Sequence, residues 1–244
     1  SSAFGLRELQ IPLCGLFGAC STMALSLIMA SLAIETGGFC CTAAATSSHF
    51  CSAERQFRNP LGYGGQRTPT AQWTVTGSGA AVLKKSDSAN DPYIETVHLG
   101  TICDMGITDA NNMGAAMAPA AKKTITDFLK DTGTSPSDYD MLLTGDLGIV
   151  GSELLCELMK KEEGIDLTSV HKDCGLMIFD RDGQDVHAGG SGCGCSASVL
   201  CSEILRKLRS GEYKKIMESY NHELNVTETY DWYNFKYFKS YLFF

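Results

Sequence analysis

The sequence is short of positive charge, with 20 Lys and Arg residues against 28 Asp and Glu, so its formal net charge is -8. A DNA-binding face needs clustered Lys and Arg, and nucleic acid is therefore not expected as a partner. The chain is also not rich enough in charge or low enough in hydrophobic residues to be disordered. Its 44% hydrophobic and 20% charged residues exclude a disordered, collagen-like or coiled-coil chain of 244 residues.

The 11 cysteines lack the even number and regular spacing of a disulfide framework. Cys40 and Cys41 are adjacent, and Cys193 and Cys195 lie in a glycine-rich run. No signal-peptide pattern precedes them. The sequence therefore predicts free thiols in a reducing cytoplasm rather than a secreted protein.

Charge is absent from residues 11–34, a stretch long enough to span a bilayer. It divides into an apolar run at 11–17, a small-residue corner at 18–22 and an apolar helix. A helix that is apolar on every side is also typical of the centre of a large layered protein. We interpret the stretch as buried core and expect no transmembrane helix.

Strand and helix patterns alternate along the chain, which predicts an α/β fold with apolar central strands. The pattern predicts strands at 11–17, 39–46, 72–85, 93–99 and 139–144, helices at 21–35, 113–132, 149–163 and 197–208, and a hairpin at 174–188 that turns at 180–183. Residues 47–71 are polar and are predicted to form a long functional loop.

The first candidate site is the corner Gly18-Ala19-Cys20-Ser21-Thr22, between a predicted strand and a helix. A cysteine there sits at a helix N-terminus, whose free N–H groups and partial positive charge favour a thiolate. A small cysteine buried in a tight turn gives the same pattern. Nucleophilic chemistry also needs a base, and His49 follows a predicted strand end, where it faces the same cleft or solvent. His171 and His187 are expected at the surface.

Two glycine-rich runs are further candidates. Gly77-Ser78-Gly79 lacks the Lys and the following helix of a phosphate loop, which favours close backbone packing over a nucleotide site. The run containing Gly190, Ser191 and Cys193 precedes a helix, so its N–H groups suit a carboxylate or phosphate. Cys-x-Cys alone is a weak zinc pattern, and no metal site is predicted.

These motifs together resemble a known family. The corner, the following helix, the strand ending at Ser48-His49 and the Gly-x-Gly strand are similar to the nucleophile half of thiolases and β-ketoacyl synthases. Within this superfamily, the amino-acid sequence resembles in particular the stage V sporulation protein AD family of spore-forming Firmicutes, over about residues 4–217. The stretches that carry the resemblance are FGACST, ATSSHFCSAERQFRNPLGYGGQ, TVTGSGA, DMGITDANNMGAAMAPAA, LLTGDLGIVGS and AGGSGCGCSA.

The resemblance implies a thiolase-like α-β-α-β-α fold that binds dipicolinic acid (pyridine-2,6-dicarboxylate), alone or with calcium. It implies no cofactor. The family resemblance also implies action with other stage V sporulation membrane proteins, a peripheral location at the inner spore membrane, and a homodimer. The catalytic His positions of the enzymes would fall near Gly145-Asp146 and within Gly192–Ser196, where this sequence has no His.

A dianion requires N–H donors, cations and an apolar slot. The expected ligand-binding residues are Cys20, Ser21, Ser48, His49, Arg55, Arg58, Arg67, Gly77, Ser78, Asp146, Gly190, Ser191 and Cys193. Asp146 is expected to orient a donor or to contact calcium. The alternative function is acyl transfer with Cys20 as nucleophile and His49 as base.

The domain expectation is two thiolase-like halves, at 1–90 and 91–217, with the fold incomplete at the N-terminus. Residues 218–244 do not resemble the family. They hold 10 of the 22 aromatic residues and contain no Gly, Pro or Ala. We expect them to be an aberrant tail, and the chain to be a fragment of a longer protein.

Overall fold

The computed structural model of the chain describes residues 2–52, 67–85, 91–109, 111–219 and 240–243. The helices are α1 (Ser2–Arg7), η1 (Ala19–Ser21), α2 (Thr22–Glu35), α4 (Met113–Thr132), η3 (Pro136–Asp138), α5 (Gly148–Leu158), η4 (Met159–Glu163), α6 (Cys174–Met177), α7 (Cys193–Val199), η5 (Leu200–Ile204) and α8 (Leu205–Ser210). The strands are β1 (Cys41–Ser48), β2 (Trp73–Thr74), β3 (Gly77–Lys84), β4 (Tyr93–Ile94), β5 (Met141–Thr144), β6 (His171–Asp173), β7 (Gly190–Ser191), β8 (Ile216–Ser219) and β9 (Ser240–Phe243).

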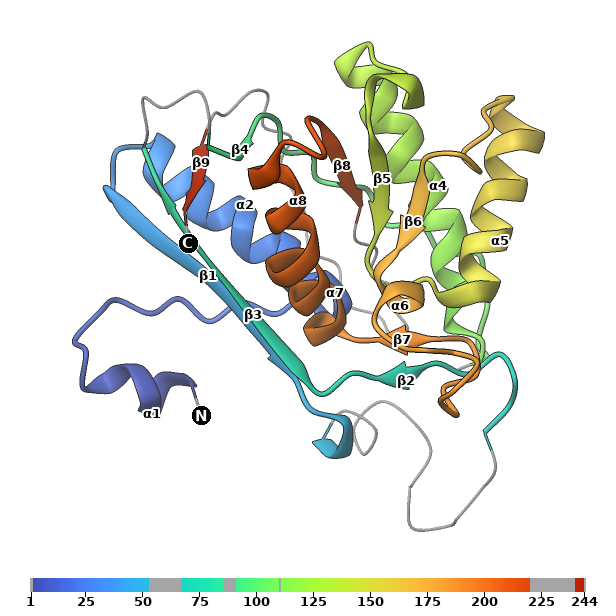
Figure 1. Cartoon of the computed structure of the whole chain (residues 1–244), viewed down its shortest axis with the longest axis horizontal. Coiled ribbons are helices and arrows are strands. Elements are labelled where there is room, and N and C mark those ends of the chain that lie inside the picture. Colours follow the sequence, from blue (N-terminus) through green and yellow to red (C-terminus); the bar gives the residue numbers. More distant parts are fainter. Residues whose placement is uncertain (1, 53–66, 86–90, 110, 220–239, 244) are drawn as a thin grey trace.

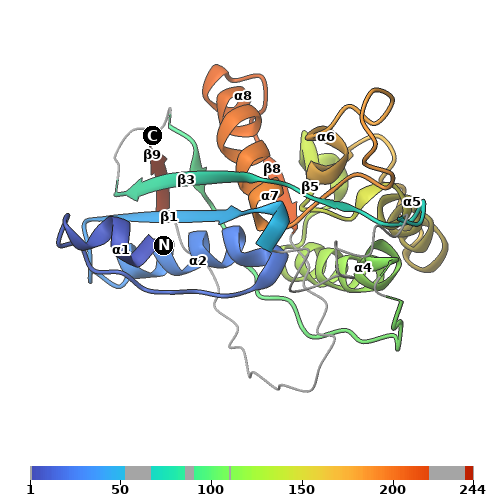
Figure 2. The same ribbon diagram turned by 90° about the horizontal axis from the view of Figure 1, so that it is seen from below.

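Two sheets enclose a layer of helices (Figures 1 and 2). The first sheet has the order β1-β3-β9-β4 and is antiparallel, with β1 and β3 paired from Cys41↔Lys84 to Ser48↔Gly77. The second has the order β6-β5-β8 and is parallel. Helices α2, α7 and α8 lie between the sheets, and α4 and α5 cover the other face of the second sheet (Figure 1). The short parallel pair β2-β7 connects the two halves.

The buried side chains of β5 alternate between two hydrophobic cores. Met141 and Leu143 join the central core, which contains α2, α7 and the inner face of β3. Leu142 joins the outer core formed with α4 and α5. Because neighbouring residues of a strand point to opposite faces, this fully buried strand packs against helix layers on both sides.

The first sheet lies unusually close to α7 because β3 carries glycines on its inner face. A Cβ added to Gly79 would collide with the carbonyl of Ala197, and one added to Gly77 would lie 2.5 Å from Ser198 Oγ. The close backbone packing predicted for Gly77-Ser78-Gly79 is thus confirmed. Ser78 and Val82 lie on the opposite, exposed face of the strand.

Most of the long elements agree with the sequence prediction. Helix α4 has the predicted bounds, with Asn112 accepting a hydrogen bond from the N–H of Ala115 and Gly133 ending it in the left-handed conformation at φ 66°. Helix α2 ends before Gly37, and α5 continues through η4 to Glu163. The helix predicted at 197–208 is also present but begins four residues earlier, at Cys193.

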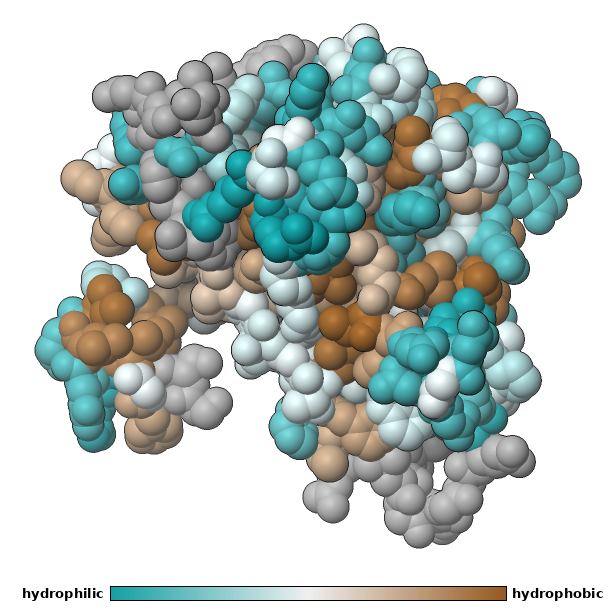
Figure 3. Space-filling view, in the orientation of Figure 1, coloured by the Kyte–Doolittle hydropathy of each residue, from teal (hydrophilic) through white to brown (hydrophobic). Residues whose placement is uncertain are grey.

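The strand predicted at 11–17 is wrong. These residues are extended but pair with no described strand, and Ile11, Leu13 and Phe17 are exposed. Pro12 cannot donate to a ladder, and Gly15 and Gly18 weaken any strand around them. Of the uncharged stretch at 11–34, only the helical part, α2, belongs to the buried core. Helix α1 and the segment that follows it lie apart from the two cores and form an apolar arm (Figure 3).

The hairpin predicted at 174–188 is also wrong, although its turn at 180–183 forms, with the N–H of Gln184 donating to Asp180 O at 2.8 Å. The chain instead pairs β6 with β5 in parallel and then enters α6. Gly175 explains the change, because its Cα packs against the carbonyl of Gly190, where an added Cβ would lie 2.5 Å away. The strand predicted at 93–99 is reduced to β4.

The remaining predictions fall partly outside the described residues. Arg55 and Arg58 lie there, as do residues 220–239 of the predicted tail. No helix in the described part of the chain is long and apolar enough to cross a membrane.

Candidate functional site

Cys20 lies at the strained corner that leads into α2. Ala19 has a φ of 42°, a left-handed value that a residue with a Cβ rarely adopts. The corner satisfies its own polar groups, since Ser21 Oγ donates to Gly18 O and Thr22 Oγ1 donates to Ala19 O, both at 2.7 Å. The hydroxyl of Ser21 is therefore engaged within the turn, and Cys20 is the corner residue whose side chain reaches the loops of the second half.

The side chain that meets Cys20 is Asp146, which follows β5. Its carboxylate is 3% exposed and accepts hydrogen bonds from the N–H of Gly192 at 2.8 Å and from Ser191 Oγ at 3.3 Å. The Cys20 thiol lies beside Asp146, close enough for the carboxylate to raise the pKa of the thiol. Three segments far apart in sequence thus converge on one buried carboxylate.

This environment raises the pKa of the Cys20 thiol well above its ordinary value. Burial is the largest cause, and the charge of Asp146 and its hydrogen bond follow; the N–H of Gly192 acts in the opposite direction. A thiolate here would place a second negative charge beside a buried carboxylate. The geometry therefore keeps Cys20 as a neutral thiol.

The loop at 190–194 is seated on the end of β1. The thiol of Cys193 donates to Ser47 O at 3.4 Å, and the N–H of Gly194 donates to Ser48 Oγ at 2.9 Å. Ser48 in turn donates to Val75 O at 2.7 Å, so its hydroxyl joins three segments. Gly192, at φ 94°, supplies the left-handed turn that this seating requires.

A second buried carboxylate, Asp173, supports the turn that carries Asp146. It accepts hydrogen bonds from the N–H groups of Leu147 at 2.8 Å and Gly148 at 3.0 Å, and from Thr144 Oγ1 at 2.7 Å. Burial is the main cause that raises the pKa of Asp173 from 3.8 to about 7. The only sequence signal for this role is an acidic residue at the end of a short strand.

His171 belongs to the same network and is not a surface residue as predicted. Its Nε2 lies 2.9 Å from Thr144 Oγ1 and its Nδ1 lies 3.8 Å from the thiol of Cys156. Burial, with a smaller contribution from Lys172, lowers the pKa of His171 from 6.5 to about 4. His171 is therefore a neutral imidazole. Its ring nitrogens contact Thr144 and Cys156 rather than the Cys20 thiol.

Gln72, which the sequence did not single out, links the two loops of the site. Its Nε2 donates to the carbonyls of Asp146 and of Gly190, the latter at 3.1 Å, and the residue is 3% exposed. The carbonyl of Gln72 accepts from Arg67 at 2.7 Å. The Arg67 guanidinium lies 4.2 Å from the ring centre of Trp73, which stacks on Phe50.

The other predicted site residues lie apart from this centre. His49 is exposed at the end of β1, and Ser78 is on the face of β3 that points away from α7. Gly77 packs against α7, and Gly190 offers its carbonyl rather than a free N–H to the site. Among the described residues, no three His, Cys, Asp or Glu side chains are grouped to hold a metal ion.

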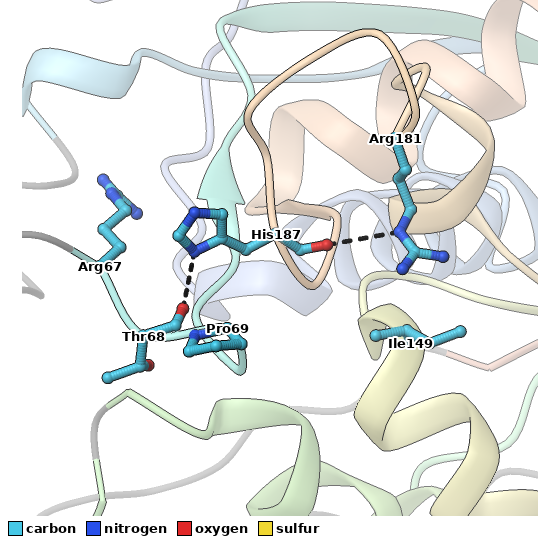
Figure 4. Close-up of a pocket in the computed structure, with 6 residues that line it drawn as sticks. All are labelled: Arg67, Thr68, Pro69, Ile149, Arg181 and His187. Carbon is cyan, nitrogen blue, oxygen red and sulfur yellow. Dashed lines mark hydrogen bonds between the residues drawn. The ribbon is translucent and has the colours of Figure 1, made fainter.

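An open cleft of about 610 Å³ lies beside the site, and Arg67 belongs to its lining (Figure 4). It is formed by the loop before β2 and the loop after α6, and it is lined by Arg67, Thr68, Pro69, Ile149, Arg181 and His187. Arg67 is the predicted site residue in this group. Arg181 was missed because it lies in the segment that the sequence predicted as the turn of a hairpin.

The layered arrangement, with a cysteine at a strained corner facing loops of a second half, defines a thiolase-like fold. Solved structures bear this out: OleA of Xanthomonas campestris (H285N with cerulenin) matches 98% of this chain and 67% of its own with a TM-score of 0.61 at 12% identity. AbyA1, a tetronic acid condensing enzyme, matches 99% and 72% with a TM-score of 0.56 at 15% identity. The 3-oxoacyl-[acyl-carrier-protein] synthase III of Aquifex aeolicus matches 99% and 70% with a TM-score of 0.54 at 9% identity.

Within this fold the chain belongs to the stage V sporulation protein AD family, whose family model matches residues 1–222. It is 48% identical over 211 residues to stage V sporulation protein AD of Bacillus subtilis (strain 168). The match covers 86% of this chain and 61% of that relative, so the chain spans less than two thirds of the relative's length.

Proposed function

We propose that this sporulation protein binds dipicolinic acid without catalysing a reaction, for uptake of the ligand into the developing spore. The observation that carries the proposal is the position of the Cys20 thiol beside the buried Asp146 carboxylate, which together with burial raises the pKa of the thiol. The fold places a cysteine at the nucleophile corner, yet its partner there is an acid rather than a base that would ionise it.

The surrounding donors support the same proposal. In an acyl-transfer enzyme, N–H groups near the nucleophile stabilise the oxyanion of the intermediate. Here the N–H of Gly192 donates to Asp146 at 2.8 Å, so this donor is already engaged by a carboxylate. An acyl intermediate on Cys20 would place its oxyanion beside that same negative charge.

The proposed ligand is a flat dianion, which calls for cations, polar donors and a wall on which a ring can lie. Cations are present near the site at Arg67 and Arg181, and Ile149 gives the adjacent cleft an apolar surface. We propose that the bound protein acts with membrane proteins of the same sporulation stage, at the inner spore membrane and as a homodimer. These parts of the proposal are what the resemblance to the family implies.

Calorimetry with dipicolinate tests the proposal on the full chain, after circular dichroism has established that it is folded. We expect saturable binding in the micromolar to millimolar range, and unchanged binding for Cys20→Ser, because a neutral thiol and a hydroxyl have similar hydrogen-bonding roles. Absence of binding at millimolar dipicolinate would overturn the proposal.

The second candidate function is acyl transfer by Cys20, favoured by the condensing-enzyme fold and by the strained corner at Ala19. Incubation with acyl-coenzyme A followed by intact-protein mass spectrometry separates the two functions. An acyl adduct on the wild type that is lost in Cys20→Ala supports the enzyme, whereas an unmodified protein supports the binding function.

A further inference from the structure

One histidine, His187, joins the two loops that form the cleft of Figure 4. It belongs to the loop after α6, and its Nδ1 lies 2.7 Å from the carbonyl oxygen of Thr68 in the loop before β2. On the other side of the ring, Nε2 lies 2.8 Å from Asp185 Oδ1. A carbonyl and a carboxylate are both hydrogen-bond acceptors. The imidazolium form carries an N–H on each ring nitrogen, so this form can donate to both partners at once.

The backbone of His187 adopts a conformation that favours glycine. Its φ is 47°, in a turn where the N–H of Gly189 donates to Val186 O at 3.0 Å. A residue with a Cβ seldom adopts this angle, and it does so where surrounding contacts offset the strain. The ring contacts with Thr68 and Asp185 can supply this compensation, since the His187 side chain is only 25% exposed.

The charged groups around the ring, among the described residues, come from both loops. Asp185 and Arg181 lie on the loop of His187, and the Nε of Arg181 donates to His187 O at 3.4 Å. Arg67 lies on the facing loop and lines the same cleft. Further side chains nearby are Asp180 and Asp182, in the turn at 180–183, and Ile149 of α5. Asp185 is thus the carboxylate that contacts the ring and attracts its protonated form.

The contact between the loops continues inward from the imidazole to the candidate site. The N–H of Ala188 donates to Ala71 O at 3.1 Å, and the N–H of Trp73 donates to Gly189 O at 2.8 Å. Gln72, whose side chain links the loops of the candidate site, lies between these two contacts in sequence. A change in how the outer ends of the loops are joined therefore reaches the residue that holds the site together.

We propose that His187 is a pH-sensitive latch on this cleft. When protonated, it donates to Thr68 O and to Asp185, and it holds the loop after α6 against the loop before β2. When the ring loses a proton to solvent, one nitrogen presents a lone pair to an oxygen acceptor, so one contact is lost and the outer wall of the cleft loosens. Histidine side chains commonly change charge between pH 5 and 8, which sets the range of the test. The latch does not depend on which ligand the cleft binds.

Hydrogen exchange of backbone amides, followed by NMR on the full chain at pH 5.5 and pH 8, tests the latch. The reporters are the N–H groups of Ala71 and Ala188, which donate to Thr68 O and Ala71 O. Rates are corrected for intrinsic exchange at each pH and compared with those of α4, which report global unfolding. We expect the two reporters to exchange about three to ten times more slowly at pH 5.5 than at pH 8.

Two variants show whether His187 is responsible. His187→Gln cannot titrate, so its reporters should exchange at the same corrected rate at both pH values, close to the wild-type rate at pH 8. His98→Gln is the matched control, because it removes the histidine of another His–Asp pair, 3.6 Å from Asp131, and should keep the full pH difference.

The latch is overturned if the wild type shows no pH difference, or if the difference persists in His187→Gln. Circular dichroism establishes whether the variant folds. If it does not, the ¹⁵N signals of the wild-type imidazole decide the matter, because the latch requires both ring nitrogens of His187 to be protonated at pH 5.5. A neutral His187 ring at that pH would contradict it.

Discussion

The thiol of Cys20 lies beside the buried carboxylate of Asp146, and this neighbour adds to burial in raising the pKa of the thiol. The two residues come from different halves of the chain, one at the start of α2 and the other just after β5. Their pairing turns a position suited to a nucleophile into one that keeps its proton. It also orders the loop at 191–192, because the same carboxylate accepts from Ser191 and Gly192.

The first prediction concerns the reactivity of this thiol. Asp146→Asn removes the negative charge and should lower the pKa of Cys20, so alkylation by iodoacetamide at pH 8 should be about three to ten times faster. Peptide mass spectrometry measures the rate at Cys20 separately from the other ten cysteines. Asp180→Asn, an exposed carboxylate of a surface turn, is the control and should not change the rate. A Cys20 rate unaffected by Asp146→Asn would mean that burial alone suppresses the thiolate.

The second prediction concerns pH and the pair formed by Asp173 and His171. The folded state raises the pKa of Asp173 from 3.8 to about 7, so it binds more protons than the unfolded state, and stability falls as pH rises through this range. The folded state lowers the pKa of His171 from 6.5 to about 4, so stability is lost as pH falls from 6.5 to 4. The two trends, each roughly 3 to 4 kcal/mol, oppose one another between pH 4 and 6.5.

Urea unfolding across this range measures both trends. In the wild type these two residues should together give a nearly flat profile from pH 4 to 6.5, and a fall from 6.5 to 7. In Asp173→Asn the free energy of unfolding should rise with pH up to 6.5, and in His171→Gln it should fall from pH 4 to 7. The slopes are compared rather than the absolute values, because each variant also loses hydrogen bonds. Parallel profiles in all three proteins would contradict the assignment.

The third prediction concerns Gln72, which joins the carbonyls of Asp146 and Gly190. Gln72→Leu leaves these two carbonyls without that donor in a buried setting, and we expect the free energy of unfolding to fall by about 2 to 4 kcal/mol. Gln184→Leu removes a comparable amide from a surface turn and should cost less than about 1 kcal/mol. Equal losses in the two variants would show that Gln72 does not link the loops energetically.

The elements that the sequence predicted well are those whose signals are local. Helix α4 has a cap residue at Asn112 and a stop at Gly133, and the corner at Cys20 is marked by small residues before an apolar helix. The strand predicted at 11–17 was wrong because the hydrophobicity of a segment does not show whether another strand lies beside it to pair with. The hairpin at 174–188 misled because the decisive contact, between Gly175 and Gly190, joins residues whose proximity no local pattern encodes.

The candidate site divides in the same way. Cys20 and the run at 190–193 were visible as motifs, and Asp146 was visible as an acid after an apolar strand. Gln72, Asp173 and Arg181 carry no motif, and their roles come from the contacts that the fold gives them: two carbonyls, two N–H groups and a shared cleft with Arg67. Sequence patterns thus found the residues at turns and missed those that connect one turn to another.

The fourth prediction tests the close approach between β3 and α7, on which the site depends. A Cβ at Gly79 would collide with the carbonyl of Ala197, and since the backbone of both elements is fixed by the core, the strand and helix would have to separate. Gly79→Ala should therefore lower the free energy of unfolding by about 1 to 3 kcal/mol.

The same substitution should also disturb the loop at 190–194, because α7 begins directly after Gly192. Dipicolinate affinity measured by calorimetry should then fall in Gly79→Ala while the protein remains folded by circular dichroism. Ser78→Ala, on the opposite exposed face of the same strand, is the matched control and should change stability by less than about 0.5 kcal/mol. If Gly79→Ala is as stable as Ser78→Ala, β3 and α7 can accommodate a Cβ at position 79. The glycine would then not be required for the site.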